Sequence, residues 1–97
     1  MILEIATLQI KPGQTLAFEQ SFQQASSIIS SMHGYLHHEL QKCMEDDHKY
    51  VLLVKWETLE DHTIGFRGSE LYQQWKALLH HYYDPFPTVE HFELVSL

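Results

Sequence analysis

The segment Tyr50 to Trp56 (YVLLVKW) constrains the fold of this chain most strongly. Its apolar run is nearly continuous and rich in residues that favour β-strands. A strand with one face in water alternates between apolar and polar residues, whereas a continuous apolar run is typical of a strand covered on both faces. We therefore expect this segment to be the central strand of a sheet.

The residues before this strand predict a strand and then a helix. Residues 2–10 alternate loosely and include β-branched residues, and Pro12 and Gly13 follow them as a turn. Between Thr15 and Met32 the apolar residues recur at spacings of four and three, which is the stripe of an amphipathic helix: Phe18, Phe22, Ala25, Ile29 and Met32. Gly34 comes next, at a position where a helix end favours a left-handed residue.

Three more elements complete the pattern. Residues 35–44 predict a second strand, and Glu45-Asp46-Asp47 a turn. Thr58 and Asp61 have the spacing of a capping box, which predicts a short helix to about Phe66. Ser69 predicts the N-cap of a longer helix. The apolar face of that helix consists of Leu71, Tyr72, Trp75, Leu78, Leu79 and Tyr82. The prolines of residues 84–87 end it, and residues 88–95 predict the last strand.

The element order is βαββαβ with the second helix split in two, which is the ferredoxin-like pattern. It predicts an α+β fold with one antiparallel sheet and both helices on one face. The length of 97 residues leaves room for a single domain, residues 1–97. Because the second face of the sheet stays bare, we expect two copies to pack sheet against sheet as a homodimer.

Charge and composition exclude several classes of partner. The formal net charge is −7, and the six Lys and Arg residues form no cluster, which disfavours nucleic acid and anionic membranes. No apolar run approaches the ~20 residues that span a bilayer. The N-terminus has neither the basic start nor the cleavage site of a signal peptide. Cys43 is the single cysteine, so a reduced, cytoplasmic setting is expected.

The central strand continues into Glu57-Thr58-Leu59-Glu60-Asp61-His62, and Arg67-Gly68-Ser69 and Tyr72-Gln73-Gln74-Trp75 follow. With the element order, these motifs resemble the antibiotic biosynthesis monooxygenase family over nearly the whole chain. The resemblance implies a dimeric α+β barrel with a pocket between the sheet and the helices of each subunit. Members of that family include cofactor-independent quinol or anthrone oxygenases, haem-degrading enzymes and a signal-molecule isomerase.

The haem-degrading branch of the family carries an Asn, a Trp and a His at positions that correspond here to Ile5, Gly65 and Trp75. None of the three is present. His80 or His81 could supply an axial histidine instead, but they lie one turn or more further along, so haem degradation is disfavoured and no cofactor is expected.

His62 is the first candidate for a catalytic residue. A partly buried imidazole can abstract a phenolic proton and so start a cofactor-independent oxygenation; a solvated helix histidine is the other interpretation. Trp56 and Trp75 could form a flat wall for an aromatic substrate, or simply pack in the core. Phe66 would help these rings to exclude water.

Arg67 and Tyr72 complete the predicted substrate-binding set. A guanidinium suits a carboxylate or an enolate, although Arg67 is equally well placed to pair with Asp61 or Glu70. A metal alternative consists of His37, Glu39 and His91, which supply two nitrogens and an oxygen. In a ferredoxin-like sheet their strands lie at opposite edges, so this trio would need the dimer partner, and no metal site is expected.

The sequence thus predicts a small monooxygenase that acts on an aromatic or quinone-like molecule. Two non-catalytic alternatives remain: a dimeric module that binds a small ligand, and an accessory or stress protein whose apolar faces serve only assembly.

Overall fold

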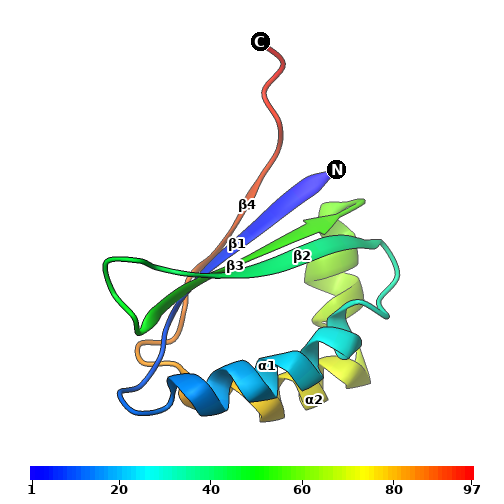
Figure 1. The fold of residues 1–97 in the computed structure, drawn as a ribbon. Helices are drawn as coiled ribbons and strands as arrows, with labels where there is room; N and C mark the ends of the chain where they lie inside the picture. Colours follow the sequence, from blue (N-terminus) through cyan, green and yellow to red (C-terminus); the bar gives the residue numbers. More distant parts are fainter.

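The computed structural model describes residues 1–97. The elements are β1 (Ile2–Gln9), α1 (Thr15–Ile29), β2 (Tyr35–Lys42), β3 (Lys49–Trp56), η1 (Asp61–Phe66), α2 (Glu70–Leu79), η2 (His80–Tyr82) and β4 (Val89–Phe92). One antiparallel sheet has the strand order β2-β3-β1-β4, and α1 and α2 lie on the same face of it (Figure 1). The predicted ferredoxin-like α+β fold is confirmed, and β3 is an interior strand.

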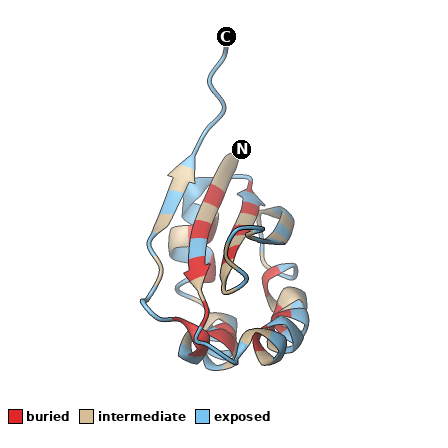
Figure 2. Ribbon diagram, turned by 60° about the vertical axis from the view of Figure 1, so that its left-hand side comes forward, coloured by how far each residue is buried: buried red, intermediate tan, exposed pale blue.

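The core lies between the sheet and the two helices. β1 and β3 pair along their full lengths, from Ile2 opposite Trp56 to Gln9 opposite Lys49. Every second side chain of these strands points toward the helices, which produces the bands of burial in Figure 2. The predicted face of α1 is buried against them: Phe18, Phe22, Ala25 and Ile29.

The other face of the sheet is not covered within one chain. On β3 the side chains of Val51 and Leu53 are only half-buried, and Lys55 is exposed. The expectation that β3 is covered on both faces is therefore not met by this chain alone. The reason is topological, because both crossover helices lie on the same side of the sheet.

Several element boundaries differ from the sequence predictions. α1 ends at Ile29, three residues before Met32. Gly34 has the predicted positive φ, of 81°, but it lies in the turn into β2 rather than at the helix end. β4 comprises only Val89–Phe92, because its pairing with β1 stops at Leu3. The residues after Phe92 are exposed and extend away from the sheet (Figures 1 and 2).

The capping box at Thr58 is confirmed. The backbone N–H of Asp61 donates to Thr58 Oγ1 at 3.1 Å, and the backbone N–H of Thr58 donates to Asp61 Oδ2 at 3.2 Å. The helix that follows is not an α-helix but a π-helix, η1, in which the backbone N–H of Arg67 donates to the carbonyl of His62 at 3.1 Å. This wider turn buries both His62 and Phe66.

The predicted cap of α2 is also confirmed, since Ser69 Oγ accepts a hydrogen bond from the backbone N–H of Tyr72 at 3.1 Å. The helix changes to a 3₁₀ turn, η2, at His80, earlier than its apolar stripe suggests. Neither α1 nor α2 has the length and hydropathy needed for a membrane-crossing helix.

Candidate active site

A cavity of about 360 Å³ lies between the sheet and the segment that runs from η1 to β4. Its floor comes from β1 and β3, and its walls come from η1, α2, η2 and the loop before β4. The residues that line it are Glu4, Ala6, Leu8, Leu52, His62, Phe66, Arg67, Tyr72, Trp75, His80, Tyr83, Phe86, Pro87 and Val89. The cavity therefore lies where the family resemblance implies a pocket.

Five of the six predicted site residues line this cavity: His62, Phe66, Arg67, Tyr72 and Trp75. Trp56 does not, and its expected role as a substrate-contacting wall is not supported. Its ring is completely buried and stacks on His62, with 5.4 Å between the ring centroids and an interplanar angle of 19°. Because β3 points Trp56 beneath η1, the indole supports the floor of the site instead.

His62 is buried, and both of its ring nitrogens face other titratable groups. Nδ1 lies 2.8 Å from His91 Nε2, and Nε2 lies 3.4 Å from Glu4 Oε1. Burial lowers the pKa of His62 to about 3, and Arg67 and His91 shift this pKa in the same direction. The imidazole is therefore neutral near pH 7, and it is a weak base.

Glu4 is a cavity-lining residue that the sequence prediction did not include. Its side chain is 6% exposed, and Oε1 accepts a hydrogen bond from Trp56 Nε1–H at 2.9 Å. Oε2 has no partner in the protein, and yet no buried polar side-chain atom is left unpaired, so Oε2 reaches the cavity. The alternation of β1 could have revealed it, because Glu4 lies on the same face of the strand as Ala6 and Leu8, the buried face.

Burial raises the pKa of the Glu4 carboxyl, and the Trp56 hydrogen bond and the charge of Arg67 partly offset this effect. Such a carboxylate is a stronger base than an exposed one. It also lies in a site that a substrate can fill, which makes Glu4 a candidate proton acceptor.

Arg67 supplies the positive charge of the site. It is exposed, it lines the cavity, and it takes part in no ion pair. Asp61, one predicted partner, instead accepts hydrogen bonds from Thr58. The guanidinium thus remains available to an anion that forms inside the cavity.

The alternative metal trio does not assemble. His37 and Glu39 lie together on β2, 3.6 Å apart, whereas His91 lies on β4 at the opposite edge of the sheet. His91 also points toward the helices to meet His62, so a copy packed on the open face could not bring it to His37.

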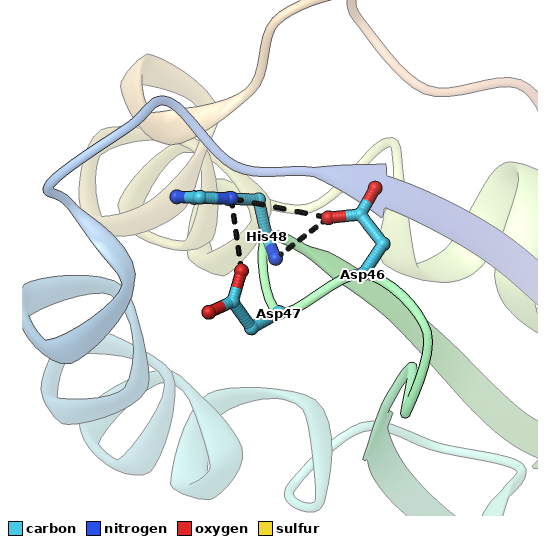
Figure 3. Close-up of side chains that lie close together, drawn as sticks. All are labelled: Asp46, Asp47 and His48. Atoms are coloured by element: carbon cyan, nitrogen blue, oxygen red, sulfur yellow. Dashed lines mark hydrogen bonds and ion pairs between the residues drawn. The ribbon is translucent and has the colours of Figure 1, made fainter.

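A second cluster lies in the turn between β2 and β3, where Asp46, Asp47 and His48 approach one another (Figure 3). The backbone N–H of His48 donates to Asp46 Oδ1 at 3.0 Å, and Gln9 Nε2 donates to Asp46 Oδ2 at 3.2 Å. Asp47 is 82% exposed and lies 3.1 Å from His48 Nδ1. These contacts account for the cluster as the hydrogen-bonded turn that the sequence predicts.

Comparison with known proteins identifies the same family that the sequence motifs resemble. The antibiotic biosynthesis monooxygenase family model matches residues 1–78. YczJ of Bacillus subtilis, an uncharacterised protein, is 64% identical over 93 residues, which cover 96% of this chain and 98% of YczJ.

Two solved structures extend the comparison. A Bordetella bronchiseptica protein named for the same family superposes with a TM-score of 0.93 at 32% identity, covering 98% of this chain and 97% of its own. SnoaB of Streptomyces nogalater, named as a cofactor-independent oxygenase, shares the fold with a TM-score of 0.70 at 17% identity, covering 98% and 91%. By the match to the family model and the 32% identity to the Bordetella bronchiseptica protein, the chain belongs to the antibiotic biosynthesis monooxygenase family.

Proposed function

We propose that this protein is a cofactor-independent monooxygenase that acts on a small aromatic or quinone-like molecule with an acidic C–H or O–H group. The observation that carries the proposal is the buried Glu4 carboxylate, which is held by Trp56, lies beside a neutral His62 and opens into an aromatic cavity. A cavity of about 360 Å³ falls within the range of ~300–1,000 Å³ that is usual for small-molecule sites.

Glu4 is the proton acceptor in this proposal, and His62 is the residue that keeps it in place. The choice follows from basicity: the pKa of Glu4 is raised, whereas that of His62 is lowered to about 3. His62 Nε2–H, directed at Glu4 Oε1, stabilises the ionised carboxylate. In this proposal, His91 Nε2–H is the donor of the 2.8 Å contact between the two histidines and His62 Nδ1 is the acceptor, which fixes that tautomer of His62.

The reaction can be written for a substrate with an activated CH₂ group. Glu4 takes one proton, and the electron pair left on the substrate delocalises into an enolate whose oxygen faces Arg67. The enolate carbon reacts with O₂, and the peroxide takes the proton back from Glu4. Loss of water then leaves a carbonyl, so one oxygen atom enters the product and the other leaves as water. The electrons come from the substrate, and no cofactor is needed.

The aromatic walls serve two purposes in this scheme. Phe66 lies edge-on to both Tyr72 and Trp75, with ring centroids 5.1 Å and 5.5 Å apart. Such rings stack favourably against a flat substrate. They also exclude water, and this strengthens the interaction between the enolate and Arg67.

A non-catalytic ligand-binding module is the alternative function. A pocket without a suitably placed proton acceptor would favour it. Glu4 and His62 both line the cavity, and a ligand store gains nothing from a buried carboxylate whose ionisation costs free energy. Catalysis is therefore the better supported function.

We propose further that the working form is a homodimer packed through the open sheet face. Ile5, Val51 and Leu53 are half-buried apolar residues on that face, with no helix above them. A second sheet packed on this face would bury these side chains, so that β3 is covered on both faces, as its nearly continuous apolar sequence predicts.

Anthrone is a suitable probe, because oxidation of its CH₂ group to a carbonyl consumes one O₂ and gives anthraquinone and water. We expect the purified protein to accelerate anthrone oxidation in metal-free buffer without added cofactor. The readouts are oxygen uptake and anthraquinone absorbance, in a ratio of one to one. Oxidation at the rate of the protein-free control, for anthrone and for a panel of quinols, would favour the binding module.

A further inference from the structure

His80 is a second polar group in the cavity, and the proposed chemistry does not use it. It begins η2, directly after α2, and lines the cavity together with the residues already described. Neither of its ring nitrogens has a hydrogen-bond partner in the protein, and no buried polar atom is left unpaired. Both ring nitrogens are therefore accessible rather than buried, on a side chain that lines the cavity.

Aromatic rings hold His80 in place. Its ring lies edge-on to Tyr72 at 6.0 Å and to Phe86 at 5.0 Å, and at 5.6 Å it is tilted against Tyr83. A ring fixed by three neighbours presents its nitrogens in a limited set of directions, so little conformational entropy is lost when a ligand binds. Burial and the nearby Lys76 charge lower the pKa of His80, which keeps the imidazole neutral near pH 7.

His80 lies on a different part of the cavity wall from His62, the residue beside the proposed proton acceptor Glu4. Ring contacts lead from His62 to Phe66 at 6.3 Å, from Phe66 to Tyr72 at 5.1 Å, and from Tyr72 to His80 at 6.0 Å. Two aromatic side chains thus separate the two histidines along one wall. The cavity lining thus combines the charged residues Glu4 and Arg67 with aromatic side chains and, from η2, the neutral polar group of His80.

We infer that His80 is a specificity-determining residue, which hydrogen-bonds an oxygen substituent of the substrate remote from the group that loses its proton. The inference rests on the proposed function for the orientation of the substrate. A neutral imidazole can donate to a carbonyl or accept from a hydroxyl. A substrate without such an oxygen would leave the imidazole desolvated and unpaired, and that penalty is the source of the discrimination.

Equilibrium binding of matched ligands tests this inference without any turnover. The probes are 4-hydroxyacetophenone and 4-ethylphenol, which differ in one carbonyl oxygen at nearly constant size, and the corresponding pair on a 2,6-substituted naphthalene. For at least one scaffold, we expect the wild-type protein to bind the ketone about 2- to 12-fold more tightly than the ethyl compound, as one hydrogen bond to a neutral group permits. Quenching of tryptophan fluorescence gives the Kd.

The His80→Phe variant keeps an aromatic ring at this position and removes the hydrogen bond. We expect the two ligands of the discriminating scaffold to bind it equally well. His81→Phe is the matched control, because His81 is exposed and does not line the cavity, and it should keep the wild-type preference. Two results would each overturn the inference: a wild-type protein that does not discriminate on either scaffold, and a preference that persists in His80→Phe. A clear ketone preference in a protein that does not oxidise anthrone would support the His80 subsite and contradict the proposed oxygenase activity.

Discussion

Trp56 and Glu4 occupy neighbouring strands in the middle of the sheet, and the hydrogen bond between them makes a buried carboxylate tolerable. An unpaired carboxyl at 6% exposure would cost several kcal/mol in its ionised form. The Trp56 Nε1–H offsets part of that cost at Oε1 and leaves Oε2 free. In the proposed reaction, the indole therefore acts through Glu4 rather than by contact with the substrate.

His62 makes the stability of the fold sensitive to acid. Its pKa is lowered from 6.5 to about 3 in the folded protein, so the unfolded chain binds an extra proton between these pH values. Stability is present above pH 6.5 and is lost as the pH falls toward 3. We expect urea unfolding to show a smaller decline between pH 7 and pH 4 in His62→Gln than in the wild type.

His33→Gln is the control for this measurement, because the His33 side chain is 92% exposed. It should follow the wild-type curve. Equal slopes for His62→Gln and wild type would mean that His62 is not held neutral by the fold.

The sequence predicted the residues of the cavity wall better than those of the cavity floor. Tyr72 and Trp75 lie where helical spacing predicts, because a periodicity of 3.6 defines one face of a helix. The roles of Glu4 and His91 depend on contacts with η1, which is distant in sequence from both. No local pattern specifies such a contact, although the phase of Glu4 in β1 pointed inward.

Among the elements, η1 and the turn that follows it position two of the polar residues that line the cavity, His62 and Arg67. The capping box fixes where η1 starts, but the same box can start an α-helix or a π-helix. Gly68 has a separate constraint, because a Cβ at this position would lie 2.5 Å from the backbone oxygen of Ile64. The Arg-Gly-Ser motif thus combines a cavity residue, a close backbone contact and the cap of α2.

Gly68→Ala should therefore destabilise the protein by about 1–3 kcal/mol, because backbone rather than a flexible side chain must move. Gly65→Ala is the matched control: its Cβ would lie 3.7 Å from the Glu60 carbonyl, an ordinary contact. We expect that control to change stability by less than about 1 kcal/mol. Urea unfolding of both variants measures the difference, and equal stabilities would contradict the constraint at Gly68.

The strand and helix order could be predicted because local signals separate successive elements, such as Ser69 at the start of α2. The length of β4 could not. Leu94 and Val95 have strand-forming character, but β1 begins at Ile2 and offers them no partner. Pairing, rather than propensity, determines where this strand ends.

For the molecule as a whole, the open sheet face is the feature that one chain leaves incomplete. Leu53 lies on β3 in the interior of the sheet, half-buried and without a helix above it. We expect the wild-type protein to be a dimer by light scattering coupled to size exclusion. A Leu53→Lys substitution should shift it toward monomer, because a desolvated charge would lie in the interface.

Gln24→Lys adds the same charge on the exposed side of α1 and should leave the dimer intact. A wild-type protein that is monomeric at micromolar concentration would contradict the proposed homodimer. A Leu53→Lys variant that stays fully dimeric would place the interface elsewhere.

The central claim is that Glu4 accepts the substrate proton, and the pH dependence of kcat/KM for anthrone oxidation tests it most directly. For the wild type, kcat/KM should rise with pH through an apparent pKa above 4.5, because burial raises the pKa of the Glu4 carboxyl and only the ionised form accepts a proton. In Glu4→Gln we expect kcat/KM to fall by about 10²- to 10⁴-fold and this pH limb to vanish. A Glu4→Gln enzyme with wild-type kcat/KM and an unchanged pH limb would contradict the claim.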